Sequence, residues 1–395
     1  MASRTLSVGA IAIAACAALS LSACSTNTAN TASGGGTASN GGGGSGATIG
    51  VAMPISGPDA PLADPIVKGI KLAVKEATAK GDLPGPLSLS VEDDQEKPEI
   101  GSSLARKFCG DNNVIAAIGD YASTVALAAQ PVYARCGLAQ LVPTASNDKL
   151  SAGGYKSFFR NTAKNSDALV SAVNWITTKH PEVKTVLTID LNTASTLDPV
   201  AQFVEQAKNK NLTVLGQVHA AAGQTDFRGA LTGIIAEKPD LVYLSTFFNE
   251  GALMTKQLRE LNYTGRIFGL DGNDSPDFVK IAGTSAAEDF ELASLGVDPS
   301  KTPEAAPFVA AYQKEYGSAP NSAAAQAYDT AQVVINAWHS TKGGTDRAKI
   351  IAAIAATQMT GTGGPIKYDS NGNLENPAVG IFGVQKGALT FLGKG

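Results

Sequence analysis

Apolar positions follow two different spacings from residue 48 onward. Short runs rich in Val, Ile, Leu and Ala, such as 48–55 and 114–119, are typical of buried strands. Longer stretches with an apolar residue at every third or fourth position, such as 66–80, predict helices. Further short strands are expected at 87–92, 138–142 and 157–160, with helical segments between most of them. This alternation predicts a parallel sheet that is covered on both faces.

A second series of the same kind begins near residue 163. Its strands are expected at 184–190, 212–219, 240–246 and 266–270, and its helices at 166–179, 199–208, 227–236 and 251–261. The C-terminal part adds helices at 303–316, 323–340 and 347–356 and short strands near 366–368, 379–384 and 389–392. The fold class is therefore α/β, with two doubly wound parallel-sheet lobes. The chain is expected to cross between them more than once, which makes a multi-strand hinge.

The expected boundaries of the two lobes lie where one series of strands and helices ends and the other begins. Lobe 1 takes residues 48–162 and 293–363, and lobe 2 takes residues 163–292 and 364–395.

The first 47 residues have a different pattern. Arg4 precedes an uncharged apolar stretch at 6–21, which is typical of a secretion signal. Leu21-Ser22-Ala23-Cys24 resembles a bacterial lipobox, in which the cysteine thiol takes a diacylglyceryl group. We therefore expect a lipoprotein signal peptide at 1–23, lipidation of Cys24 and a flexible Gly/Ser/Thr/Asn tether at 24–47. The alternative is an ordinary cleaved signal with a chance cysteine. Lipidation of Cys24 would make this an extracytoplasmic protein that is anchored to the cell membrane by its lipid.

Composition narrows the class of protein further. With 44% hydrophobic residues, 17% charged residues and a net charge of −4, the chain is of ordinary globular type and has no electrostatic reason to bind nucleic acid. After cleavage and lipidation the remaining thiols are Cys109 and Cys136, both at the ends of helical stretches that lead into neighbouring strands. In an oxidising compartment they predict one disulfide.

The residues of a catalytic centre are not found together in this sequence. His180, His219 and His339 stand in no metal-ligand spacing, and the folded part has neither a nucleophile elbow nor a phosphate-binding loop. Glu92-Asp93-Asp94 is either a calcium-binding cluster or, as the favoured interpretation, a solvated strand end. We expect no enzyme activity, no cofactor and no metal, and a secreted hydrolase is disfavoured.

Two polar turns follow successive strands of the first series. They contain Tyr121, Ala122 and Ser123 in the turn at 120–124, and Thr144, Ala145 and Ser146 in the turn at 143–147. Ligands of open parallel sheets bind outside the carboxyl ends of the strands, where helices present free N–H groups. Both turns can therefore surround a carboxylate with donors, although helix capping is the alternative role for such residues.

An acid ends a strand of the second series. Asp271 follows the strand at 266–270, and Ser275-Pro276 supplies the next helix with its own cap, so Asp271 is free for another role. A carboxylate at a strand tip suits a ligand ammonium group. Donors on one wall and an acid on the other are complementary to a zwitterion.

The turn Met53-Pro54-Ile55-Ser56-Gly57-Pro58 resembles the opening turn of type I substrate-binding proteins of ABC importers, specifically the leucine/isoleucine/valine-binding group. The resemblance runs from about residue 48 to the C-terminus. It is carried further by Glu92-Asp93-Asp94 and by the segments at 119–123, 143–146, 155–160, 240–243 and 365–372. It implies the type I periplasmic-binding-protein fold, in which two α/β lobes joined by three crossovers close on a small ligand that passes to a permease.

The resemblance also implies roles for single residues. The carboxylate-binding serine of the family falls on Ser123, and its next two contacts fall on Thr144 and Ser146. The acid that receives the ligand's amino group falls on Asp271, and an aromatic wall position falls on Phe247.

This sequence departs from the family pattern at several wall positions. The tyrosine expected after the first strand of lobe 2 is replaced by Asn192-Thr193-Ala194-Ser195, so that Ser195 stands at the site. Leu62 occupies a position that is often aromatic, and Ala323 replaces a bulky wall residue. Cys136 departs from the disulfide partner position of the best-known members. The pocket is therefore expected to be roomier than one shaped for leucine, or to have different walls.

Our hypothesis is a monomeric, lipid-anchored binding protein that delivers an amino acid, branched-chain or related, to ABC permease subunits by cleft closure. One alternative keeps the fold and binds urea, a short amide or an aromatic acid. Another is a sensory ectodomain that feeds no importer, which the presence or absence of neighbouring permease genes would distinguish.

Overall fold

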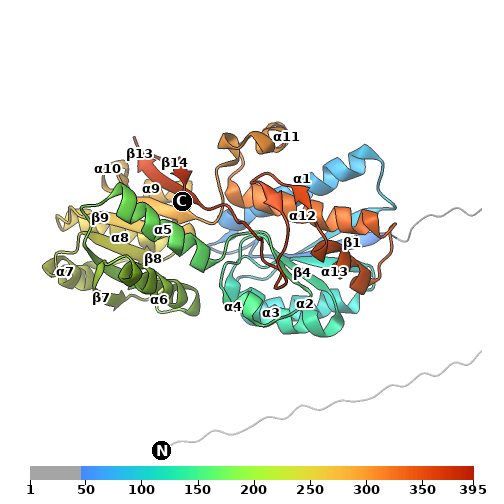
Figure 1. Ribbon diagram of the computed structural model, residues 1–395, viewed down its shortest axis with the longest axis horizontal. Coiled ribbons are helices and arrows are strands. Elements are labelled where there is room, and N and C mark those ends of the chain that lie inside the picture. The colour runs from blue at the N-terminus through green and yellow to red at the C-terminus, as the bar shows by residue number, and fades with distance from the viewer. Residues whose placement is uncertain (1–45) are drawn as a thin grey trace, which may run out of the picture. The chain divides into compact units, whose positions relative to one another are not determined.

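The computed structural model describes residues 46–395 (Figure 1). The predicted signal peptide, Cys24 and the tether up to residue 45 lie outside the described residues. The described part contains two large sheets and one two-stranded sheet. Lobe 1 below means the five-stranded sheet with its helices, and lobe 2 means the seven-stranded sheet with its helices.

The sheet of lobe 1 is parallel throughout. Its strands lie in the order β2-β1-β3-β4-β5. Their bounds are β1 Ala47–Met53, β2 Leu87–Asp93, β3 Val114–Gly119, β4 Ala139–Val142 and β5 Phe158–Arg160. Every residue of β3 and β4 is buried, as expected for central strands covered on both faces.

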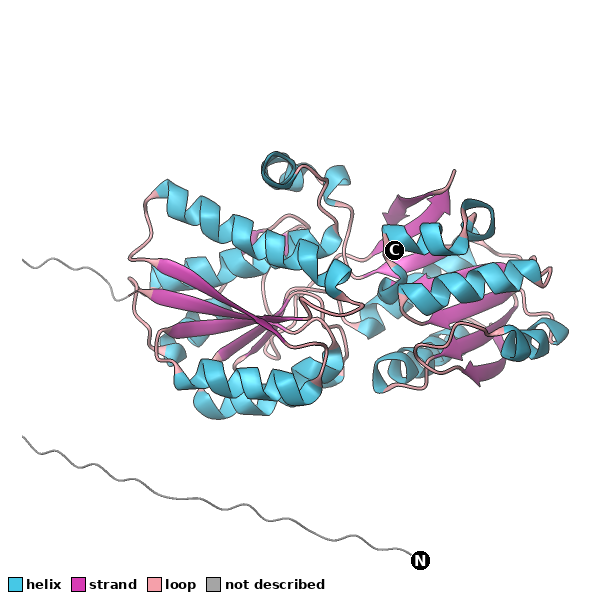
Figure 2. Cartoon of the chain, turned by 180° about the vertical axis from the view of Figure 1, so that it is seen from behind, coloured by secondary structure: helices cyan, strands magenta, loops and turns pink. Residues whose placement is uncertain are grey.

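Helices cover both faces of this sheet (Figure 2). The helices of this lobe are α1 Ala60–Lys80, α2 Pro98–Gly110, α3 Ser123–Cys136, α4 Lys149–Ala152, α11 Ala306–Tyr316, α12 Ser322–Ser340 and α13 Arg347–Ala355, of which α11 packs on α1 and α12 and not on the sheet. The core between the sheet and α1, α12 and α13 is separate from the core under α2 and α3. Helices α1 and α12 approach closely because Gly69 has no side chain: a methyl group there would overlap the carbonyl oxygen of Ala324.

The predicted disulfide is present in lobe 1. Cys109, in the last turn of α2, is bonded to Cys136, the last residue of α3, with 5.9 Å between their Cα atoms. Arg347 of α13 donates from Nη1 to the carbonyl oxygens of both cysteines, at 3.1 Å and 3.4 Å. Its other nitrogens reach the carbonyls of Phe108, Asp111 and Val114. The guanidinium thus places positive charge at the C-terminal ends of α2 and α3, where helix carbonyls favour a cation.

The sheet of lobe 2 combines parallel and antiparallel pairing. Its order is β14-β13-β10-β9-β8-β6-β7, and the pairs that involve β13 are antiparallel. The strands are β6 Thr185–Asp190, β7 Thr213–His219, β8 Leu241–Ser245, β9 Arg266–Leu270, β10 Glu291–Ser294, β13 Gly380–Gln385 and β14 Ala388–Lys394. The helices are α5 Asn165–Lys179, α6 Ala194–Asn209, α7 Arg228–Ala236, α8 Phe248–Glu260, α9 Pro276–Ala282 and α10 Thr284–Ala287, with the short 3₁₀ turn η1 Asp271–Asn273. Two further 3₁₀ turns, η2 Pro299–Lys301 and η3 Pro303–Ala305, follow β10 and lead into α11 of lobe 1. The α/β class with two doubly wound lobes is confirmed, with an antiparallel edge added by the C-terminal hairpin.

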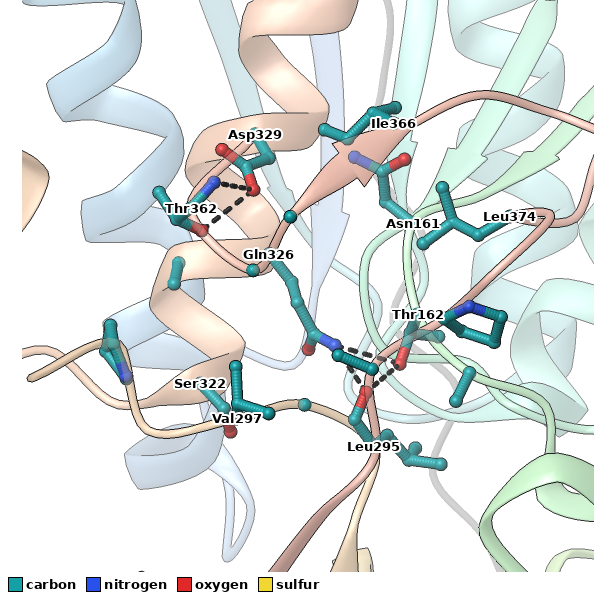
Figure 3. A pocket seen from close by; sticks show the side chains of 18 of the residues that line it. Asn161, Thr162, Leu295, Val297, Ser322, Gln326, Asp329, Thr362, Ile366 and Leu374 are labelled. Atoms are coloured by element: carbon teal, nitrogen blue, oxygen red, sulfur yellow. Dashed lines mark hydrogen bonds between the residues drawn. The ribbon is translucent and has the colours of Figure 1, made fainter. Parts of the chain in front are cut away.

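Three segments connect the lobes and border a shared cavity (Figure 3). The chain passes from β5 to α5, returns after β10, and crosses again before β13. Gln326 of α12 ties two of these segments together, because its Nε2 donates to Thr162 Oγ1 at 3.1 Å and to the Leu295 carbonyl at 2.7 Å. Asp329, one turn later, accepts hydrogen bonds from the backbone N–H and the hydroxyl of Thr362, both at 2.8 Å. The multi-strand hinge is therefore braced from lobe 1.

The third passage of the chain between the lobes lies later in the sequence than predicted. The short strands β11 Met359–Thr360 and β12 Pro365–Ile366 pair with each other, and Ile366 and Tyr368 lie in the core of lobe 1. The Tyr368 ring packs against Phe159 with 5.2 Å between ring centroids. The segment that follows residue 363 thus belongs to lobe 1 up to about Leu374, and the expected boundary between 363 and 364 is wrong. The cause is burial, because these apolar side chains complete the lobe 1 core.

Within residues 46–395, none of the helices combines the length and the apolar character needed to cross a membrane.

Candidate functional site

A cavity lies between the carboxyl ends of the two sheets. It holds about 640 Å³ of space, part of which is open to solvent. Its lining combines turns that follow strands of both lobes: Tyr121, Ala122, Ser123, Thr144, Ser146, Asn147, Asn165, Ser195, Thr196, Pro199, Ser245, Thr246, Phe247, Leu270, Asp271 and Gly272.

The wall from lobe 1 is a set of hydrogen-bond donors. Helix α3 begins at Ser123, and its N-cap residue Ala122 has no side chain that could cap the first turn. The first N–H groups of this helix are therefore unsatisfied by a cap, and the positive end of its dipole lies at the cavity. Thr144 adds a buried hydroxyl that finds no hydrogen-bond partner among the described residues. Such an arrangement suits the carboxylate of a ligand.

A buried arginine holds the turn at 143–147, which follows β4, in place. Arg160, at the end of β5, is fully buried, and its Nη2 donates to the Asn147 carbonyl at 2.9 Å. The Asn147 N–H donates in turn to Ser123 Oγ at 3.2 Å, which links the turns after β3 and β4. Burial lowers the pKa of Arg160 to about 10, so that the guanidinium stays charged at neutral pH. The hydrogen bonds of Arg160 and Asn147 thus hold the two lobe 1 turns, which carry the hydroxyl groups, in fixed positions.

The wall from lobe 2 contains the acid. Asp271 follows β9 directly and opens η1, and its carboxylate accepts no side-chain hydrogen bond within the described part of the chain. Burial raises its pKa to about 7, and the nearby charge of Asp274 adds to the rise. As expected, α9 has a separate cap, because Ser275 Oγ accepts a hydrogen bond from the Asp277 N–H at 3.2 Å. A carboxylate with free lone pairs beside a cavity is a receptor for a cationic group.

The structure brings eight of the ten expected ligand-binding residues to this cavity. They are Tyr121, Ala122, Ser123, Thr144, Ser146, Ser195, Phe247 and Asp271. Leu62 lines an adjoining cavity that shares Asp271. Ala145 is the exception: it is not among the lining residues, because its methyl group is buried in a small core with Leu150 and Phe158.

Sequence reasoning missed several lining residues. Those added by the structure are Asn147, Asn165, Thr196, Pro199, Ser245, Thr246, Leu270 and Gly272. Ser245 ends β8 and Thr246 follows it, so the rule that found the turns of lobe 1 also applies to them. Asn165 has no such signal: it begins α5 just after the first crossing, and its buried Oδ1 has no partner among the described residues.

The start of α6 differs from the prediction for a physical reason. The sequence predicts a helix at 199–208, but α6 begins at Ala194 and contains Pro199 in its interior. Proline has no N–H, so the Ser195 carbonyl loses its usual intrahelical partner. Ser195 and Pro199 both line the cavity on the lobe 2 side.

The acidic cluster at the end of β2 is a solvated strand end only in part, because Glu92 and Asp93 are partly exposed and Asp94 is not. Asp94 is fully buried, its Oδ2 has no partner within residues 46–395, and burial raises its pKa to about 6. In the same part of the chain no group of three or more His, Cys, Asp or Glu side chains is arranged to hold a metal ion.

The raised pKa of Asp271 has a consequence for stability. A carboxyl whose pKa is higher in the folded state binds more protons when folded, so the free energy of unfolding falls as pH rises from about 4 to about 7. We expect the ligand-free protein to lose roughly 2 kcal/mol through this group between pH 5.5 and pH 8. Urea unfolding at both pH values checks this, and Asp271→Asn should show a smaller loss than the wild type. Equal losses in the two proteins would show that Asp271 ionises as it does in the unfolded chain.

Comparison with known proteins identifies the family. The family model described as periplasmic binding protein matches residues 46–388, which is nearly all of the described chain. The chain belongs to the periplasmic binding protein family. Membership places it among binding proteins that act outside the cytoplasm and not among enzymes.

Relatives and solved structures agree with this assignment. The Leu/Ile/Val-binding protein homolog 1 of Brucella melitensis is 25% identical over 347 residues, covering 86% of this chain and 91% of the relative. The crystal structure of the leucine-binding protein LivK of Thermotoga maritima superimposes with a TM-score of 0.81 at 25% identity, over 88% of this chain and 98% of that one. A solute-binding protein of R. palustris in complex with benzoate has the same fold, with a TM-score of 0.78, 23% identity, and coverage of 89% and 96%. The predicted resemblance to the leucine/isoleucine/valine-binding group and the type I periplasmic-binding-protein fold are confirmed.

Proposed function

We propose that this periplasmic binding protein is anchored by a lipid at Cys24 and delivers an amino acid to the permease of an ABC transporter. The observation that carries the ligand class is the pairing of two walls: an uncapped helix end with hydroxyls on lobe 1, and the unpaired Asp271 on lobe 2. The α-carboxylate binds Ser123, Thr144 and Ser146, and the α-ammonium binds Asp271. Relatives named as Leu/Ile/Val-binding proteins support the amino-acid class.

Cleft closure is the proposed mechanism of transfer. A ligand that touches both walls contacts both lobes only when they are together, so it shifts the population toward the closed form. The shift is limited by the difference between its affinities for the two forms. The permease then recognises the closed form.

Direct contacts between the lobes support this mechanism. Asp198 of α6 accepts a hydrogen bond from Asn147 Nδ2 at 3.0 Å and forms an ion pair with Lys149 Nζ at 2.7 Å, and both partners follow β4 of lobe 1. These interactions lower the pKa of Asp198, so the carboxylate is ionised at neutral pH. We call this contact the rim latch.

Removing the rim latch should weaken ligand binding without touching the ligand. Asp198→Ala removes one charge-assisted hydrogen bond and a half-exposed ion pair, which together contribute about 1 kcal/mol, so the Kd is expected to rise about fivefold. Isothermal titration calorimetry measures the change. Glu205→Ala, which removes an exposed carboxylate from the same helix, is the matched control and should leave the Kd unchanged. Identical Kd values for Asp198→Ala and the wild type would show that the latch does not favour the closed form.

The ligand assignment is tested on the full protein. Mass spectrometry of the small molecules that co-purify with it, followed by calorimetry with the standard amino acids, urea and benzoate, identifies the ligand class. Tight binding of an amino acid supports the proposal, and tight binding of urea or benzoate without any amino acid overturns it. Mass spectrometry of the mature N-terminus checks for the diacylglyceryl group on Cys24.

A further inference from the structure

A second cavity continues the ligand cavity beyond Asp271. It holds about 450 Å³ of space and shares Tyr121, Thr144 and Asp271 with the first. The rest of its lining comes from both lobes and from the start of α12: Leu62, Asp274, Ser294, Leu295, Asn321, Ser322, Ala323 and Gln326. A ligand held at Asp271 therefore has room to extend toward α12.

This extension contains a second acid on the same side of the chain as the first. Asp271 and Asp274 are joined by the 3₁₀ turn η1, in which the Asp274 N–H donates to the Asp271 carbonyl at 2.8 Å. Side chains three residues apart in a 3₁₀ turn are eclipsed, and the rise of about 2 Å per residue separates them by about 6 Å along the axis. Both carboxylates line the extension. The lobe 2 wall thus carries two neighbouring carboxylates, those of Asp271 and Asp274.

Neither acid has a positive partner at the cavity. The residues that line the two cavities include no lysine, arginine or histidine. Asp274 accepts one hydrogen bond within the described chain, from Ser294 Oγ at 2.7 Å. Burial raises the pKa of Asp274 to about 6, and its charge in turn raises the pKa of Asp271, so the two groups repel each other. An amino acid with a neutral side chain would bring one cation to two enclosed carboxylates.

The extension also offers apolar surface to an unbranched aliphatic side chain. Leu62, Leu295 and Ala323 provide apolar surface, and the small side chain of Ala323 leaves space beside α12. We propose that the ligand is a basic amino acid, whose α-ammonium binds Asp271 and whose side-chain amine or guanidinium binds Asp274. This inference rests on the proposed function and specifies the side chain of its ligand.

The test compares two amino acids of almost equal shape. Ornithine and norleucine have side chains of the same length, but ornithine ends in an ammonium and norleucine ends in a methyl group. At pH 8, where both acids are ionised in the free protein, calorimetry should give a Kd at least tenfold lower for ornithine or for lysine than for norleucine. In Asp274→Asn the preference should fall below threefold, because an amide still accepts from Ser294 but carries no charge. Asp277→Asn, which removes an exposed carboxylate of α9 outside both cavities, should keep the full preference.

The outcomes separate this inference from the proposed function. If norleucine or leucine binds the wild type as tightly as ornithine and lysine do, the inference is wrong and the amino-acid function stands. An unchanged preference in Asp274→Asn also overturns it, because the side-chain cation then lies elsewhere. If no amino acid binds at all, the proposed function fails together with the inference. The wild-type comparison decides the question even if Asp274→Asn does not fold.

Discussion

Replacing Asp271 with alanine is expected to raise the Kd for an amino-acid ligand by about 30-fold or more. The carboxylate lines the cavity between the lobes, accepts no hydrogen bond from another side chain of the described residues, and is placed to pair with the ammonium of the proposed ligand. Removing one partner of such a buried charge pair costs about 2 kcal/mol or more, because the other charge stays buried without compensation. Since about 1.4 kcal/mol corresponds to a tenfold change, calorimetry should resolve the loss easily.

Two further variants show whether the loss comes from charge. Asp271→Asn keeps the shape of the side chain and should also bind weakly, since an amide cannot neutralise an ammonium. Asp289→Asn removes an exposed carboxylate of lobe 2 that does not line the cavity, and should bind like the wild type. A Kd for Asp271→Ala within threefold of the wild-type value would mean that the ammonium binds another group.

Removing the disulfide is expected to lower the free energy of unfolding by about 3 kcal/mol and to leave ligand affinity unchanged. The bond closes a loop with a sequence separation of 27 residues, and the loss of loop entropy in the unfolded chain favours folding by about that amount in the chain-entropy model. Cys109 and Cys136 lie at the C-terminal ends of α2 and α3, whereas Ser123, at the other end of α3, lines the ligand cavity. Loss of the disulfide should therefore lower the free energy of unfolding without changing the Kd for the ligand.

Denaturant unfolding of the double variant Cys109→Ala/Cys136→Ala measures the effect. Reduction provides the internal control: it should bring the wild type to the stability of the variant and leave the variant itself unaffected. A double variant that is as stable as the oxidised wild type would show that the hydrogen bonds of Arg347 alone hold the two helix ends together.

The elements that could be predicted from sequence are those whose pattern is local. Strand β3 is a continuous apolar run and is buried throughout, and the glycine after α1 ends that helix as expected. The positions of Ser123, Thr144, Ser146 and Asp271 at the cavity follow from the rule that ligands bind at the carboxyl ends of parallel strands. These features need only the order of elements along the chain.

The features that escaped prediction depend on neighbours far away in sequence. Nothing near Ile366 or Tyr368 in the sequence indicates that they fill the core of lobe 1. Arg160 looks like an ordinary strand-end arginine, yet it is fully buried and holds the Asn147 carbonyl. The charge environment of Asp271 also required the structure, since it depends on which side of η1 Asp274 faces and on the absence of a cation from the cavity lining.

The packing of α12 against α1 bears on how the protein is made. The core of lobe 1 joins Ile66 and Ile70 of α1 with Val333 and Trp338 of α12, and all of lobe 2 except its C-terminal hairpin lies between these helices in the chain. During synthesis from the N-terminus, the first sheet emerges long before the helix that must cover one of its faces. That apolar surface stays open until most of the polypeptide has left the ribosome, so completion of the first half is a late event in folding. An exported chain with this topology can cross the membrane unfolded and acquire its native structure on the far side.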